Sequence, residues 1–204
     1  MNALLQKAAE SLNTMGFQAS VFDTAQEAKA AAVSLIGSES VGFGGSDTVE
    51  KLKLYEELEE RGNTLYWKRK VPETLHHQTR KQTLTADWYV LSANALTTSG
   101  KIINIDGHGN RVAASVYGPP KVLFIVGRNK VVEGGLTAGL ERAHNVACAQ
   151  LSRLRGRRTP CAVTGKCVDC HSPDRGCRAT LILEKPMTMG QRIYVFLVDE
   201  DMGI

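Results

Sequence analysis

Helix-like and strand-like hydrophobic patterns alternate over the first ninety or so residues, and this alternation constrains the fold more than any other feature. Helical spacing is clear in the first segment, where Leu4, Leu5, Ala8 and Leu12 would share one face. The expected elements are helix 2–15, strand 17–22, helix 24–36, strand 40–44, helix 46–61, strand 64–68, a helix from Pro72 to about Thr85, and strand 87–93. This order predicts an α/β fold with a mainly parallel, Rossmann-like sheet and helices on both faces.

The pattern changes in the second half of the chain. Residues 101–118 read as two strands around a turn rich in Gly, Asn and Asp, which predicts a β-hairpin. The later expected elements are strand 121–127, helix 133–148, and the closing strands 179–184 and 192–198. No internal repeat or linker interrupts the sequence, so we expect one domain over residues 1–204.

Composition and charge narrow the class of protein. Hydrophobic residues make up 43% of the 204 residues, which is enough for a sizeable core without disulfides. The net charge of +4 is too small to indicate a nucleic-acid partner. The amino-terminal segment lacks the order of a secretory signal, and no apolar run reaches the length of a membrane span. We therefore expect a cytoplasmic protein without a membrane partner, in which thiols stay reduced.

A glycine-rich segment, GFGGSDT (42–48), joins a predicted strand to a predicted helix. Gly44 and Gly45 would allow close backbone approach, and free N–H groups at the start of a helix favour an anion, so these glycines and Ser46 are candidate ligand-binding residues. The alternative is a tight turn in which Ser46 only caps the helix. The segment matches neither of the common nucleotide-binding glycine motifs, so no nucleotide cofactor is inferred.

A second polar segment, residues 92–112, follows a buried strand, where α/β sheets place their ligands. Its polar residues are Asn94, Asn104, Asp106, His108, Asn110 and Arg111. Arg111 could clamp a carboxylate or phosphate, and Asp106 could act as a general base or orient Arg111. The alternative is turn chemistry, because Asp-Gly and Gly-Asn pairs suit a hairpin; His108 is expected to be an exposed turn residue.

Four of the five cysteines lie close together near the carboxyl end. They are Cys161, Cys167, Cys170 and Cys177, within an irregular insertion at about residues 157–178. The Cys167-x-x-Cys170 pair and the two outer thiols could hold an iron–sulfur cluster or zinc, with disulfides or redox thiols as the alternatives. Cys148 lies on an apolar helical stripe and is expected to be a core thiol. The preceding arginine run, RLRGRR (153–158), is either a solvated face or an attraction for an acidic partner or anionic ligand.

The segments GFGGSDT, SANAL, SGKIINIDGHGNRVAA, YGPPKVLFIVGRNKVV and TPCAVTGKCVDCHSPDRGC together resemble the lactate-utilisation (LUD) domain family, in its stand-alone branch with a cysteine-rich segment. The resemblance implies the fold shared by CoA transferases, ribose-5-phosphate isomerase and glucosamine-6-phosphate deaminase. It also implies a role in the oxidation of lactate or a related hydroxy acid, alongside iron–sulfur partner proteins. By position it adds Gly100 and Gly107 to the second ligand loop.

One departure from the family pattern excludes a mechanism. Relatives often carry an acidic residue just before the glycine of the second loop, whereas Thr97, Thr98 and Ser99 precede Gly100 here. Hydroxyl groups cannot replace the carboxylate nucleophile of a CoA transferase. Three hypotheses remain: a protein of hydroxy-acid utilisation that binds a small anionic metabolite, an isomerase or hydrolase of the sugar-phosphate type with Asp106 as base, and a redox-sensing assembly protein without catalysis. A homo-oligomer is compatible with each of them.

Overall fold

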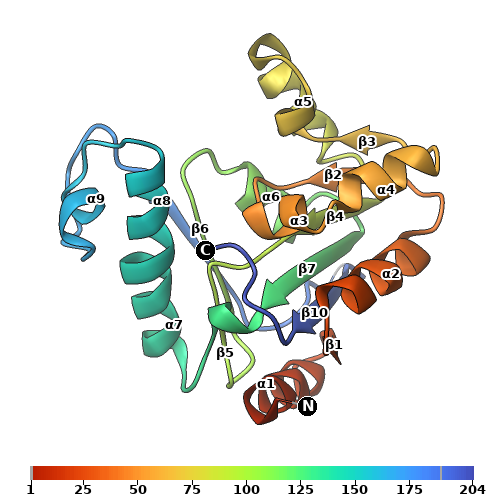
Figure 1. Ribbon diagram of the computed structural model, residues 1–204, viewed down its shortest axis with the longest axis horizontal. Helices are drawn as coiled ribbons and strands as arrows, with labels where there is room; N and C mark the ends of the chain where they lie inside the picture. Colours follow the sequence, from red (N-terminus) through yellow and green to blue (C-terminus); the bar gives the residue numbers. More distant parts are fainter. Residues whose placement is uncertain (1, 189) are drawn as a thin grey trace.

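A computed structural model describes residues 2–188 and 190–204 and shows two β-sheets with helices packed outside them (Figure 1). The helices are α1 (Ala3–Thr14), α2 (Ala25–Ile36), α3 (Asp47–Lys51), α4 (Leu54–Glu60), α5 (His76–Gln82), α6 (Asn110–Val116), α7 (Leu136–Arg142), α8 (Ala149–Leu154) and α9 (Pro160–Thr164), with short 3₁₀ turns η1 (Lys68–Lys70), η2 (Glu73–Leu75) and η3 (Arg128–Lys130) and a π-type turn η4 (Ala143–Cys148). The strands are β1 (Gln18–Phe22), β2 (Val41–Phe43), β3 (Leu65–Tyr66), β4 (Trp88–Leu91), β5 (Ala95–Thr97), β6 (Ile102–Asp106), β7 (Lys121–Gly127), β8 (Val131–Val132), β9 (Ala179–Leu183) and β10 (Arg192–Val198).

The larger sheet confirms the predicted parallel architecture. Its order is β1-β10-β7-β4-β2-β3, and every neighbouring pair runs parallel. The carboxyl ends of β2, β4 and β7 therefore lie along one edge of the sheet. The chain segments that follow these three adjacent strands meet there, which is where α/β proteins commonly bind ligands.

A second, four-stranded sheet of order β8-β5-β6-β9 lies beside the first and was not predicted from the sequence. Its middle strands, β5 and β6, form an antiparallel hairpin whose turn contains Gly100 at φ +78°. The amide N–H of Gly100 donates to the Thr97 carbonyl across this turn. The second sheet brings β6, and with it Asp106, to the same edge as the ends of the parallel strands.

The hairpin predicted over residues 101–118 is wrong, because the chain leaves β6 and enters the helix α6. The side chain of Asp106 accounts for the helix that forms in place of the hairpin's second strand. One carboxylate oxygen accepts from the backbone N–H groups of Gly107 (2.8 Å) and His108 (3.3 Å), and the other accepts from that of Arg111 (2.9 Å). These bonds satisfy the Arg111 N–H in the first turn of α6 and the Gly107 and His108 N–H groups of the preceding turn, and they direct the chain away from a second strand.

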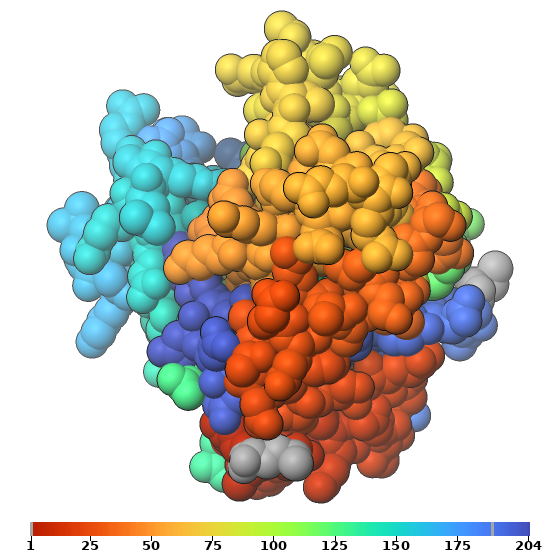
Figure 2. Space-filling view, turned by 45° about the vertical axis from the view of Figure 1, so that its right-hand side comes forward, coloured from red at the N-terminus to blue at the C-terminus, as the bar shows by residue number. Residues whose placement is uncertain are grey.

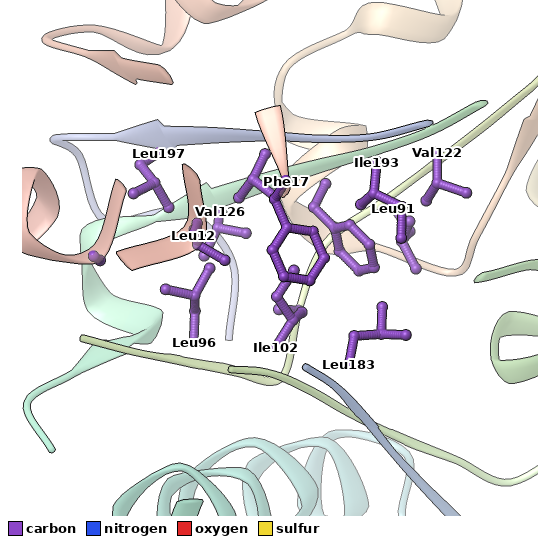
Figure 3. Close-up of a cluster of buried hydrophobic side chains, with 14 of the residues drawn as sticks. Leu12, Phe17, Leu91, Leu96, Ile102, Val122, Val126, Leu183, Ile193 and Leu197 are labelled. Atoms are coloured by element: carbon purple, nitrogen blue, oxygen red, sulfur yellow. The ribbon is translucent and has the colours of Figure 1, made fainter. Parts of the chain in front are cut away.

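Side chains on the two faces of the parallel sheet pack into two separate hydrophobic cores. On β7, Val122, Phe124 and Val126 face the second sheet, while Leu123 and Ile125 face α2 and α4. Figure 3 shows the first of these cores, filled from both sheets and from α1 by residues such as Leu12, Phe17, Leu96, Ile102 and Leu183. Trp67 and Trp88 are buried in the other core, as expected from their strand-like surroundings.

Two predicted helices differ from the observed ones. The helix expected over 46–61 is divided into α3 and α4 by Lys53, which adopts a left-handed conformation at φ 51°. The helix expected over 133–148 extends through the π-type turn η4 into α8 and covers the outer face of the second sheet. A search of the described part of the chain finds no helix with the length and apolarity that crossing a membrane requires.

Candidate functional site

A polar cleft lies at the carboxyl ends of β2, β4 and β7, between the turn before α3 on one side and α8 on the other. In the space-filling view, α8 and the cysteine segment (cyan) stand beside the residues of α3 and α4 (orange), with carboxyl-terminal residues (dark blue) between them (Figure 2). The cleft consists of two adjoining cavities, a larger and a smaller one, both partly open to solvent. The residues that line both cavities are Gly45, Asn94, Arg111, Leu151 and Arg155.

The glycine-rich loop contributes unequally to this cleft. Gly45 lines both cavities, and Ser46 lines the smaller one. Ser46 caps α3, since its hydroxyl accepts from the Val49 N–H at 3.3 Å, as the alternative interpretation of this loop proposed. Gly44 does not line the cleft; its N–H donates to the Val90 carbonyl, and a side chain there would press on Leu91 at 3.0 Å. Gly44 is therefore required by packing.

Asn94 and Arg111 hold the second loop at the cleft. The Asn94 side-chain oxygen accepts from the Ile105 N–H at 2.7 Å, which ties the end of β4 to β6. The Arg111 side chain is largely buried, and its Nε lies 4.0 Å from the Asp106 carboxylate with no hydrogen-bond partner among the described residues. Asn110 and Gly107 line the larger cavity beside them. This arrangement brings most of the residues predicted from the second loop to one place.

Asp106 lies in the wall of the larger cavity, and its carboxylate is already stabilised by hydrogen bonds from the backbone. Burial raises its pKa, but the Arg111 charge and the three backbone N–H donors outweigh burial and lower the pKa overall. A carboxylate held in this way is a weak base. The geometry suits a residue that orients Arg111 and the loop, while its predicted catalytic role stays a prediction.

Gly100 lies away from the cleft, contrary to its predicted place in the ligand loop. It occupies the β5–β6 turn against α1, where a side chain would meet the backbone of Ser11 at 3.1 Å. Gly107, in contrast, approaches the cysteine segment closely, and a side chain there would meet the Gly176 carbonyl oxygen at 2.7 Å. Gly100 is therefore needed in the β5–β6 turn, whereas Gly107 allows the cysteine segment to pack closely against the cleft.

Four further basic residues line the cleft. No role was predicted for Lys68 and Lys130, and Arg155 and Arg157 were considered only as part of the arginine run. Lys68 and Arg157 line the larger cavity, Lys130 lines the smaller one, and Arg155 lines both. Among the described residues, none of the four has a carboxylate within 4.0 Å. Two of them, Arg155 and Arg157, come from the arginine run, so this part of the run serves the cleft. Lys130 follows the buried strand β7 just as Asn94 follows β4, and the same positional rule could have found it.

Lys130 is the most buried of these cations, with 4% of its surface exposed. Its Nζ donates to the hydroxyls of Thr48 (2.8 Å) and Ser92 (3.1 Å), which carry no charge. Burial, helped by the nearby Arg142 guanidinium, lowers the pKa of Lys130 to about 7. Burial and the charges of Arg80 and Arg155 likewise lower the pKa of Lys68 to about 8. Both ammonium groups would gain from an anion placed beside them.

All five cysteines line one further, small cavity. Cys148, on η4, joins Cys161, Cys167, Cys170 and Cys177 there, so it is not only the core thiol that its apolar stripe predicted. None of the five forms a disulfide. Over the described residues, however, no group of three or more Cys, His, Asp or Glu side chains is close enough to hold a metal ion.

Arginine side chains and one histidine organise the cysteine segment. Arg175 donates to the carbonyls of Cys170 and Cys177, both at 2.8 Å, and forms an ion pair with Asp169. His144, on η4, approaches the Cys167 sulfur with its Nδ1 at 3.8 Å. Cys148, Ser152, Gly176 and Cys177 line both this cavity and the larger cavity of the cleft. The cysteine segment is thus a wall of the cleft.

Comparisons with known proteins support the fold and the family. The family model described as the LUD domain matches residues 5–198. A crystal structure of a DUF162 family protein from Deinococcus radiodurans superposes with a TM-score of 0.56, covering 96% of each chain at 16% sequence identity. At that identity the similarity establishes a shared fold. No curated protein matches the chain.

Proposed function

The chain belongs to the LUD domain family, and from this premise we propose that it binds a small anionic metabolite in the cleft and serves the utilisation of lactate or a related hydroxy acid. The observation that best supports this proposal is the surplus of positive charge in the cleft. Lys130 and Lys68 have depressed pKa values there, and the largely buried Arg111 side chain has one nitrogen without a hydrogen-bond partner in the described part of the chain. Groups of this kind, converging on one cavity, favour the binding of an anion.

The proposal extends to the setting in which the protein works. A cytoplasmic location would keep its five thiols reduced. The family resemblance adds iron–sulfur proteins as partners in the oxidation. The alternative with Asp106 as a general base gains less support, because that carboxylate is engaged by three backbone donors.

Ligand-dependent thermal stability tests the proposal. Lactate and glycolate at about a hundredfold excess over Kd should stabilise the protein by roughly 2.7 kcal/mol, which corresponds to a rise in Tm of about 5 to 10 °C. Arg111→Met should lose most of this rise. Arg192→Met removes an exposed arginine at the opposite, amino-terminal end of β10 and should retain it. An absence of any shift with hydroxy acids, phosphosugars and nucleotides would overturn the proposal.

The cysteine cavity supports a second candidate function, the binding of an iron–sulfur cluster or zinc. Five thiols and His144 surround one small space, and such soft ligands select these metals. Binding would require Cys161, Cys167, Cys170 and Cys177 to move closer together than they are in the described structure. The insertion that carries these four cysteines is irregular and, apart from α9, without helix or strand, so a rearrangement would break little regular structure.

Anaerobic purification followed by metal analysis and a visible spectrum tests this candidate. Iron with broad visible absorption indicates an iron–sulfur cluster, and one colourless equivalent of zinc indicates a structural site. Cys170→Ser should reduce the metal content, while Ser172→Ala, a neighbouring change that leaves every thiol in place, should not. A wild-type protein that holds neither metal would exclude this candidate and leave the anion cleft unaffected.

A further inference from the structure

The cleft carries more positive charge than one carboxylate can neutralise. Its basic lining residues are Lys68, Arg69, Arg111, Lys130, Arg155 and Arg157, and its acidic ones are Asp47 and Asp106. Both carboxylates are already engaged: Asp47 accepts from Arg69 at 2.6 Å, and Asp106 accepts from three backbone N–H groups. Charges confined in a cavity without partners are costly, so this surplus points to a ligand of more than one negative charge.

The surplus charge is divided between two places. We call the first the Lys130 subsite, formed by Lys130, Ser92 and Ser46 in the smaller cavity. The second is the Lys68 subsite, formed by Lys68 and Arg157 in the larger cavity. Arg111 and Arg155 border both cavities and so lie between the two subsites. A molecule bound along this shared wall would therefore border both subsites.

We propose that the cleft takes a small organic acid that carries a second anionic group, with its carboxylate in the Lys130 subsite and a phosphate in the Lys68 subsite. This inference rests on the proposed function and specifies its substrate class. The larger cavity is lined by three guanidinium groups, which can pair with phosphate oxygens in a bidentate manner. The hydroxyls of Ser92 and Thr48 fix the ammonium of Lys130, which leaves its third hydrogen for a carboxylate oxygen.

Titration calorimetry with matched ligand pairs tests this inference on the full chain. The pairs are glycolate with 2-phosphoglycolate, and glycerate with 3-phosphoglycerate. In each pair, the phosphorylated acid should bind at least about tenfold more tightly, because its phosphate adds charge-assisted hydrogen bonds to the cations of the Lys68 subsite. Equal affinities within both pairs would overturn the inference. Binding of glycolate that depends on Arg111 would then still support the proposed function.

Three variants locate the two groups within the cleft. Lys68→Met should weaken binding of the phosphorylated acid by a much larger factor than binding of glycolate. Lys130→Met should weaken both members of each pair by a similar factor. Lys185→Met removes an exposed lysine outside the cleft and should change neither affinity. Circular dichroism would confirm that each variant is folded.

The pattern of losses has two outcomes that would count against the inference. If Lys68→Met weakens glycolate as much as 2-phosphoglycolate, both ligands occupy one subsite and the two-group assignment is wrong. If none of the four acids binds to the wild-type protein, the inference fails, and the thermal shifts with lactate decide the proposed function separately.

Discussion

Asp106 shows how one side chain can hold a loop and a binding residue together. Its two oxygens accept three backbone N–H bonds, and its charge lies near the Arg111 side chain. In Asp106→Asn, the amide nitrogen replaces one acceptor and opposes a backbone donor. We expect a loss of about 1–3 kcal/mol in the free energy of unfolding, measured by urea denaturation. Asp23→Asn, at an exposed position, is the control and should change stability by less than about 0.5 kcal/mol.

The same variant separates an anchoring role from a catalytic one. If Asp106 acts mainly as an anchor, the variant loses stability and ligand affinity together. A variant with wild-type stability and affinity but no turnover of a sugar phosphate would instead establish Asp106 as a general base and contradict the anchoring role.

Lys130 should make stability depend on pH. Its pKa is about 7 in the folded protein, because burial and the charges of Arg142, Arg111 and Lys51 outweigh the opposing carboxylate of Asp47. The unfolded chain keeps the ordinary value of 10.5 and binds more protons between these limits, so stability rises with pH there. The wild type should therefore gain about 1 kcal/mol per pH unit over Lys130→Met from pH 7 to 9, as measured by denaturant unfolding. If the difference in stability between the wild type and Lys130→Met stayed constant with pH, it would contradict the burial of an amine that lacks a carboxylate partner.

At the scale of secondary structure, hydrophobic periodicity predicted most of the parallel sheet but failed where side chains bond to the backbone. The segment 101–118 contains the turn residues of a hairpin, yet the Asp106 carboxylate starts α6 instead. The break at Lys53 and the second sheet depend on tertiary packing, which a local pattern does not contain. Gly100 was assigned to the ligand loop by family position, whereas the structure uses it in the β5–β6 turn.

The packing of the cysteine segment on the β6–α6 turn depends on Gly107. A side chain at this position would meet the Gly176 carbonyl oxygen at 2.7 Å, so backbone must move. We expect Gly107→Ala to displace the cysteine segment, seen as faster limited proteolysis after Arg157 and Arg158. The matched variant is Gly109→Ala, which has open space but a left-handed backbone at φ +82°; it should cost about 1 kcal/mol without speeding cleavage. Equal protection in both variants would show that the segment adapts to the added methyl group.

At the scale of the whole molecule, residues from distant parts of the sequence form the cleft, and this limits what the sequence could predict. Polar residues that follow buried strands were recognisable, as with Asn94, because the carboxyl ends of parallel strands share an edge. The contact between Gly107 and Gly176 was not recognisable, since it depends on how the second sheet and α8 pack. The same packing places Cys177 and Cys148 in the wall of the cleft. The cleft and the cysteine cavity are therefore neighbours in one site.

This shared wall predicts a link between ligand binding and thiol reactivity. Cys177 borders both cavities, whereas Cys161, Cys167 and Cys170 border only the cysteine cavity. Burial raises the pKa of Cys148 to about 12, so this thiol should stay unreactive at neutral pH. In metal-free protein, saturating 2-phosphoglycolate should slow alkylation of Cys177 by iodoacetamide several-fold and leave the other three accessible thiols unchanged, as followed by peptide mass spectrometry. Equal slowing of all four would indicate a general stabilisation of the fold, and no slowing of Cys177 would place the ligand away from this wall.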